Sequence, residues 1–268
     1  MKVIRVIALL ILAVATAMSL GANLLAPHGY VEQFRQHANE PPSRSFPLGT
    51  DDLGRDRLSR LLQGTRISLL CAAAAAFVAT STATVIGLVA GYFGGWVDEM
   101  IGAMTDLFLS LPWLFALLTL RALFPLNTSP EASLAATFLL LAAVGWAPSA
   151  RVIRASVANL RNSGSIVHAR AYGCGNTRLL CFHIFPNLKP VLSAQFWILV
   201  PAFILTEANL GVLGLGINEP ASSWGNMLGE LQNYQRIPEQ PWILAPALLL
   251  VLVVGSLQFV VSRRNIWE

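Results

Sequence analysis

Charged side chains are scarce in this chain. Asp, Glu, Lys and Arg together make up 12% of its 268 residues, and the mean hydropathy is +0.60. A soluble domain usually carries about 25% of these residues, because its surface faces water. The scarcity argues against a soluble domain and predicts an integral membrane protein.

The residues on which enzymes and metal sites depend are also few. The three cysteines lack the paired spacing of zinc ligands, and there is no Gly-x-x-x-x-Gly-Lys-Ser/Thr loop to cradle the phosphates of ATP. The four histidines lie in loops or at the edge of an apolar run, so none is placed to activate a serine within the membrane. We therefore expect no catalytic residue, no metal site and no cofactor bound by this chain.

The positive charge does not form a patch for nucleic acid. The net charge is only +4, and much of the positive charge flanks apolar runs or lies in a single loop. A nucleic-acid-binding surface needs basic residues clustered on one face. Nucleic acid is therefore not an expected partner.

Long uncharged runs dominate what is present. Residues 6–31, 67–97, 132–150 and 240–262 contain no charged residue, and 100–120 and 190–218 contain one each. Because about 20 apolar residues span the hydrocarbon core, the sequence predicts an all-α integral membrane bundle of about six transmembrane helices. Residues 1–66 would form the first helix and an extracytoplasmic amphipathic segment, and residues 67–268 a five-helix core. The four-residue spacing of Gly87, Gly91 and Gly95 predicts close helix packing.

The segment Arg151 to Pro190 has six basic residues and no acidic one. An excess of Lys and Arg marks cytoplasmic loops, so this segment is expected on the cytoplasmic side. Within it, Gly173 suits the C′ position of a short helix, where φ is positive, and Asn176 suits the cap of a second helix.

Both termini are expected in the cytoplasm. Lys2 and Arg5 precede the first apolar run, and Arg263 and Arg264 follow the last. The N-terminus also looks like a secretory signal peptide, but apolar sequence continues beyond any cleavage site, which favours a retained helix. Residues 121–131 are expected as a short outer loop.

Residues 46–60 read FPLGTDDLGRDRLSR. Leu58, Leu61 and Leu62 fall on one face of a short helix, and the charged side chains of Asp56, Arg57 and Arg60 fall off it. Such a pattern is typical of an amphipathic segment at the membrane interface.

Several stretches resemble the permease subunits of ABC importers, and most closely their dipeptide, oligopeptide and nickel branch. Residues 47–60 match every specified position of Pro-Leu-Gly-Thr-Asp-x-x-Gly-Arg-Asp-x-x-Ser-Arg, and residues 90–98, 207–216 and 223–225 are also similar to the family. Ala169, Gly173 and Pro186 match its cytoplasmic-loop pattern of Glu-Ala-Ala, three residues, Gly, nine residues and Ile-x-Leu-Pro. Val167 and His168 depart from that pattern, because they stand where the family usually has Glu and Ala.

The resemblance implies a permease that couples closure of ATPase subunits to alternating access. Its substrate would be a dipeptide, an oligopeptide or a related small solute, nickel included. The implied partners are a second permease subunit, two ABC ATPase subunits that hydrolyse ATP, an extracytoplasmic solute-binding protein and the lipid of a bacterial inner membrane. The residues implied to contact an ATPase are Val167, His168, Ala169, Arg170, Gly173, Arg178, Ile184 and Pro186.

Polar side chains within the apolar runs are candidates for the translocation path. They are Asp106, Glu207 and Asn209. A carboxylate at the centre of a transmembrane helix costs roughly 2.5–3.5 kcal/mol on insertion scales, so such residues often carry function. Asp106 is equally compatible with a place at the interface, and Glu207 with an exposed place at the outer end of its helix.

The rival function is a secondary transporter that acts without an ATPase. The sequence shows no internal repeat of the kind on which many secondary transporters are built. Co-purification of a separate ATPase would distinguish the two functions.

Overall fold

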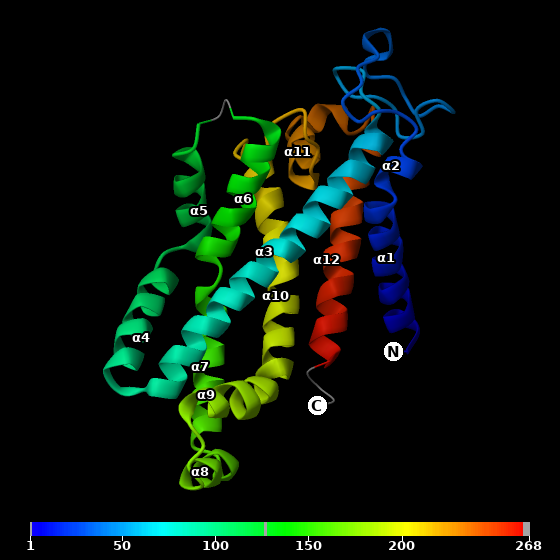
Figure 1. Ribbon diagram of the computed structural model, residues 1–268. Helices are drawn as coiled ribbons and strands as arrows, with labels where there is room; N and C mark the ends of the chain where they lie inside the picture. The colour runs from blue at the N-terminus through cyan, green and yellow to red at the C-terminus, as the bar shows by residue number, and fades with distance from the viewer. Residues whose placement is uncertain (1, 126–127, 265–268) are drawn as a thin grey trace. The chain divides into compact units, whose positions relative to one another are not determined.

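Helices account for nearly all of the regular structure. The computed structural model describes residues 2–125 and 128–264, and over those ranges it contains no strand, only an isolated bridge between Thr50 and Asp56. In chain order (Figure 1) the elements are α1 Lys2–Leu20, α2 Ala22–Leu25, η1 Arg35–His37, α3 Arg57–Phe93, α4 Gly95–Ser110, α5 Trp113–Ala122, α6 Pro130–Val144, α7 Ala147–Arg161, α8 Gly164–Ala171, α9 Asn176–Arg178, the π-helical turn η2 Leu179–Ile184, α10 Phe185–Val212, α11 Trp224–Gly229, η3 Glu230–Gln232, η4 Tyr234–Arg236, η5 Pro241–Leu244 and α12 Ala245–Arg264.

The predicted bundle of about six transmembrane helices is confirmed. Within the described residues, five helical stretches are long and apolar enough to cross a membrane, namely Val3–Leu20, Arg57–Phe93, Pro130–Arg161, Asn176–Val212 and Pro241–Ser262. A sixth span is bent, because α4 and α5 meet at 81°. Pro112 explains the break: a proline disfavours helical backbone at the preceding residue, and Leu111 is extended at φ −79° and ψ 131°.

Two helices extend beyond their apolar runs. α3 begins at Arg57 rather than at residue 67, because the Asp56 carboxylate accepts hydrogen bonds from the backbone N–H groups of Leu58 (3.3 Å) and Ser59 (3.1 Å) in the manner of a helix cap. The run 132–150 is followed by α7, which carries helical structure to Arg161, into the segment that was expected as a loop.

The chain divides into two compact units. Unit 1 comprises Met1–Ala74, Leu118–Leu139 and Val200–Glu268. In this unit α1 packs along α12, and α1 begins where α12 ends (Figure 1). On α1, Ala8 and Ala15 are seven residues apart and are at most 5% exposed. Small side chains at this spacing let the two helices approach closely. The side of the membrane on which the termini lie stays a prediction.

Unit 2 comprises Ala75–Leu117 and Leu140–Leu199. Two of the predicted packing glycines face α7: a Cβ at Gly87 would lie 2.8 Å from Ile153, and one at Gly91 would lie 2.7 Å from Val157. The third, Gly95, begins α4 and has no such neighbour. α4 also packs on α7, where Arg154 lies 2.5 Å from Asp98.

Candidate functional site

The segment that resembles the ATPase-contacting loop forms a helix-turn-helix in unit 2. α8 ends at Ala171, and the chain then turns through Gly173, whose φ is +80°. The N–H of Cys174 donates to the carbonyl of Ala169 (3.1 Å) and that of Gly173 to the carbonyl of Arg170 (3.0 Å). These two bonds make a Schellman motif, which requires a positive φ at C′. The position predicted for Gly173 is confirmed.

Most of the residues implied to contact an ATPase are on the surface of unit 2. Val167, His168, Arg170, Gly173, Arg178 and Pro186 are exposed, Ala169 is half-buried and Ile184 is buried. Ala169 packs against the core cluster that contains Ile166 and Ile184. The residues therefore lie on helical segments linked by the turn at Gly173, and Ile184 packs in the core cluster beneath Ala169. Their contact with an ATPase stays a prediction.

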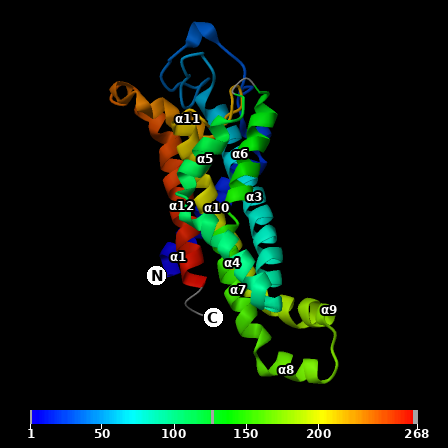
Figure 2. The ribbon, with the colours of Figure 1, turned by 90° about the vertical axis from the view of Figure 1, so that its left-hand side faces the viewer.

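Tyr92 connects this segment to the end of α3. Its hydroxyl donates to Asn176 Oδ1 (2.7 Å), its carbonyl accepts from Arg161 Nη1 (3.0 Å), and the Arg170 guanidinium lies 6.0 Å from its ring centroid. Figure 2 shows α8 and α9 at the end of unit 2 where α3 and α7 also finish. Through Tyr92, the stretch 90–98 therefore stabilises the helix-turn-helix.

One local prediction in this segment is wrong. Asn176 does not cap the second helix: Gly175 occupies the N-cap position, and no side chain bonds to that end. Asn176 is instead the first residue of α9, and its side-chain oxygen accepts from the Tyr92 hydroxyl. Tyr92, the partner of Asn176, lies 84 positions before it in the sequence, so no local pattern indicated this bond.

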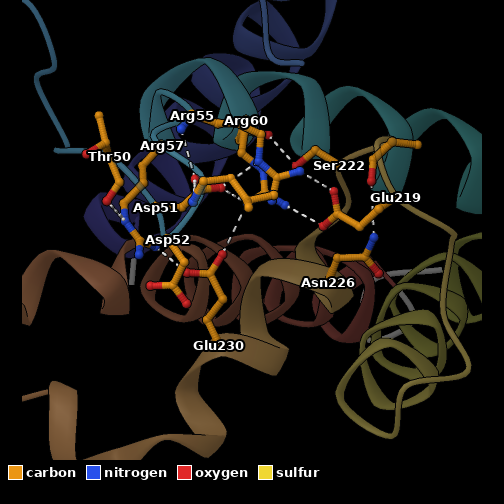
Figure 3. A network of polar contacts seen from close by, with 12 residues as sticks. Thr50, Asp51, Asp52, Arg55, Arg57, Arg60, Glu219, Ser222, Asn226 and Glu230 are labelled. Carbon is orange, nitrogen blue, oxygen red and sulfur yellow. Dashed lines mark hydrogen bonds and ion pairs between the residues drawn. The ribbon is translucent and has the colours of Figure 1, made fainter. Parts of the chain in front are cut away.

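A network of charges lies in unit 1 (Figure 3), in which the arginines and Asp51 are buried and the Glu219 side chain is 51% exposed. At its centre is Arg60, which is 2% exposed and reaches three carboxylates: Asp51 (2.5 Å), Glu219 (2.9 Å) and Glu230 (3.2 Å). Arg55 pairs with Asp51 (2.7 Å) and also with Glu219. The 46–60 motif and the segments after α10 are therefore held together by ion pairs between residues far apart in sequence.

Electrostatics within the network favour its ionised form. Burial alone would raise the pKa of Asp51, but the backbone N–H of Arg55 and the charge of Arg60 outweigh it, so the pKa of Asp51 lies below its usual range. Burial alone would lower the pKa of Arg55, but hydrogen bonds to Glu219 and Asp51 raise it. Both groups are charged at neutral pH.

Three charged side chains of the 46–60 motif are buried, although its amphipathic pattern predicted that they would be exposed. Asp56, Arg57 and Arg60, expected on the solvated face of an interfacial helix, are at most 4% exposed. Arg60 pairs with Glu219 and Glu230, which lie 159 and 170 residues away, and Arg57 also pairs with Glu230. Asp56 accepts a hydrogen bond from the Ser59 hydroxyl (2.5 Å). Sequence reasoning missed both glutamates, because no local pattern marks a pairing over that distance.

The three candidates for the translocation path have different surroundings. Glu207 on α10 is fully buried, and its Oε2 accepts from Ser68 (3.1 Å). Asn209, two residues further on, is exposed. Asp106 on α4 in unit 2 is exposed and pairs with Arg151. The exposed place considered for Glu207 is therefore not the one it occupies, and the assignment of all three to a path stays a prediction.

Glu207 lies where three helices of unit 1 meet. Ser68 on α3, which donates to Glu207, also accepts from the backbone N–H of Trp224 on α11 (3.1 Å). Next to it, α10 and α11 approach so closely that a Cβ at Gly211 would lie 2.3 Å from the backbone of Gly225. The stretches 207–216 and 223–225, which both resembled the family, therefore form a single packing contact.

Comparison with known proteins gives a consistent result. Residues 83–264 match the family model described as "Binding-protein-dependent transport system inner membrane component". The dipeptide transport system permease protein DppC of Alkalihalophilus pseudofirmus is 32% identical over 252 residues, which is 94% of this chain and 80% of the relative. The oligopeptide transport system permease protein OppC of Mycobacterium bovis is 34% identical over 233 residues, 86% of this chain and 77% of the relative.

A solved structure supports the fold. An inward-facing conformation of the MetNI methionine ABC transporter superposes with a TM-score of 0.58 at 18% sequence identity, covering 78% of this chain and 97% of that one. At this level of identity the likeness concerns the helical architecture alone.

Proposed function

This chain belongs to the family of binding-protein-dependent transport system inner membrane components and is the membrane-spanning permease subunit of an ABC importer, and we propose that it transports dipeptides or oligopeptides. The observation that carries the substrate class is the extent of the match to dipeptide and oligopeptide permeases, which covers 94% and 86% of this chain. A permease of this family works with an ATPase and a solute-binding protein.

The finer assembly and orientation are part of the proposal. One companion permease completes the pore, two ATPase subunits bind and hydrolyse ATP, and a solute-binding protein docks from outside. Both termini and the 151–190 segment face the cytoplasm of a bacterial cell. The absence of acidic residues from that segment supports this side, because cytoplasmic loops are enriched in Lys and Arg.

The geometry of unit 2 supports the proposed coupling mechanism. An ATPase that closes on α8 moves a surface whose turn is bonded to Tyr92 at the end of α3. Because α3 is one continuous helix of 37 residues, a displacement of Tyr92 shifts a transmembrane span directly. That shift is the structural step by which ATP-driven closure changes access to the path.

Reconstitution tests the proposal. The chain is purified with its companion permease and ATPase subunits, placed in liposomes with the solute-binding protein outside, and supplied with labelled di- and tripeptides and internal ATP. We expect uptake that requires both ATP and the binding protein. Uptake by this chain without an ATPase would instead establish a secondary transporter, and ATP-driven uptake of non-peptide solutes alone would refute the peptide assignment.

A further inference from the structure

Arg121 is a buried arginine in unit 1 that has no acidic partner within the described part of the chain. It lies in the last turn of α5, not in the outer loop expected from residue 121 onward, and it is 1% exposed. Its Nη2 donates to Ser133 Oγ (2.7 Å) and to the carbonyl of Gly216 (3.1 Å). Both acceptors are neutral, so the positive charge is not balanced by them.

Most of the donors of this guanidinium are unused. Nε and Nη1 are buried and have no hydrogen-bond partner among the residues that the structure describes. Nε carries one N–H and Nη1 carries two, so three of the five donors of the side chain lack an acceptor. Over residues 2–125 and 128–264, no carboxylate forms an ion pair with Arg121. The other buried arginines of unit 1 each pair with at least one acid; they are Arg55, Arg57 and Arg60.

Arg60 shows how a buried arginine in this protein is otherwise accommodated. Arg60 is as deeply buried and also leaves its Nε without a partner, but three carboxylates balance its charge (Figure 3). An unpaired charge inside a membrane-spanning segment lowers stability, and such residues are retained for function. Within the described residues, Arg121 therefore has no carboxylate that would offset the free-energy cost of burying its charge.

The surroundings of Arg121 hold it in place without neutralising it. Ser133 Oγ accepts from Arg121 and from the backbone N–H of Asn218 (3.1 Å), and the Asn218 amide donates to Thr128. These neighbours are polar and uncharged, and they fix one edge of the guanidinium. The other edge, formed by Nε and Nη1, is buried without an acceptor among the described residues, and a planar guanidinium is well suited to bind an anion through such an edge.

We propose that Arg121 binds the C-terminal carboxylate of the transported peptide during passage through the permease. This inference rests on the proposed function. A carrier of peptides with varied sequences can depend only on groups that all of them share, and the terminal carboxylate is the shared anion. Nε and Nη1 are covered in the present conformation, so the carboxylate reaches them in another state of the alternating-access cycle.

Matched peptide pairs test the proposal in the reconstituted importer. Each pair is a free acid and its C-terminal amide, chosen because the solute-binding protein binds both equally. For the wild-type complex we expect faster uptake of the acid, and in Arg121→Gln a loss of that uptake by roughly 10- to 100-fold, the size of a charge-assisted hydrogen bond. Uptake of the amide should fall much less than uptake of the acid. The exposed Arg44, changed to Gln, serves as the control and should alter neither rate.

A second measurement does not depend on the binding protein. The purified permease pair is heated in detergent with the same acid or amide at millimolar concentration. The acid, and not the amide, should raise the unfolding midpoint of the wild type, and this difference should vanish in Arg121→Gln. Arg121→Met, without ligand, should unfold at the same temperature as the wild type or higher, because it removes an unpaired buried charge.

Other outcomes overturn the proposal. If Arg121→Gln slows acid and amide equally and releases the companion permease, then a carboxylate of that subunit is the partner of Arg121. If Arg121→Met unfolds several degrees below the wild type, the guanidinium is a structural element. Both results leave peptide transport by the wild type intact, whereas a wild-type complex that imports no peptide contradicts the proposed function itself.

Discussion

Asp51 shows how a single residue links stability to pH. Its pKa is lower in the folded protein than in the unfolded chain, so its contribution to stability is present above the unfolded pKa of about 3.9 and is lost as pH falls through the folded pKa. We expect Asp51→Asn to lower the free energy of unfolding by about 3 kcal/mol at pH 7, because Arg55 and Arg60 lose a buried partner. The difference should shrink below about pH 4.

Unfolding midpoints of the detergent-purified complex at pH 7 and pH 3.5 measure this effect. The control is Asp52→Asn, because Asp52 is 57% exposed and pairs with the partly exposed Arg236. Exposed pairs contribute at most about 1 kcal/mol, so the control should change little at either pH. An Asp51→Asn defect of the same size at both pH values would contradict the linkage.

Two substitutions at Glu207 distinguish a structural role of this side chain from a role in transport. Gln at this position keeps an acceptor for Ser68 and loses the charge, whereas Leu removes the acceptor and leaves the Ser68 hydroxyl unsatisfied. We expect Glu207→Leu to lower the free energy of unfolding by about 1–3 kcal/mol and Glu207→Gln to lower it less. If Glu207 lines the path, Glu207→Gln still slows uptake. Unchanged uptake and assembly in Glu207→Gln would leave it a packing residue only.

At the scale of elements, the contact between α10 and α11 has no room for a methyl group. A Cβ at Gly211 would lie 2.3 Å from the backbone of Gly225, and backbone cannot be displaced as a side chain can. We expect Gly211→Ala to lower the free energy of unfolding by about 1–3 kcal/mol through overpacking. Gly255→Ala in α12 is the matched control, because a Cβ there meets nothing within 4 Å and alanine favours a helix.

Thermal unfolding of the two alanine variants is the measurement. The control should be as stable as the wild type or slightly more stable. Equal midpoints for Gly211→Ala and the wild type would show that the two helices can separate at no cost.

The turn in the ATPase-contacting segment should be sensitive to shape. Gly173 has φ +80°, which a β-branched residue rarely adopts, so Gly173→Val should distort the turn. Ala169→Asp places a charge at a half-buried contact beside the Ile166 cluster. We expect both variants to insert normally but to recover less ATPase on co-purification and to transport less peptide.

Gly175→Val is the control for the turn. Gly175 has φ −69° and no neighbour in the way of a Cβ, so the same substitution is unstrained there. Because Val167 stands where the family usually has an acid, ATPase recovery from the wild type should depend little on salt. Full ATPase recovery and normal transport from both Gly173→Val and Ala169→Asp would refute this segment as the coupling element.

At the scale of the whole molecule, the chain is expected to need its companion. Large apolar side chains are exposed on many of its helices, and a pore completed by a second permease would cover part of that surface. We expect the chain expressed alone to be unstable or inactive and to be rescued by co-expression of the companion permease. Yield and midpoint in detergent, with and without the companion, are the readouts. Transport by the single purified chain in liposomes would contradict this expectation.

Local patterns in the sequence determined much of this protein. Uncharged runs predicted the bundle of about six spans, because the thickness of the hydrocarbon core sets the length of an apolar helix. Gly173 was placed at its C′ position because the ability to adopt a positive φ without strain is a property of glycine itself. The motifs of residues 47–60 and of the 167–186 segment indicated the permease family by their residues alone.

Only the tertiary structure decided the surroundings of the polar residues. Arg60 is in the charge network because Glu219 and Glu230 come back to it from more than 150 residues away. Asn176 bonds to Tyr92 and does not cap its helix. Arg121 is buried without an acidic partner among the described residues, although its sequence position suggested an outer loop. Backbone conformation and insertion into lipid depend on residues that are neighbours in the sequence, so both can be predicted from local sequence patterns. The partner of a charge depends on which distant segments fold against it, and only the packed helices show that.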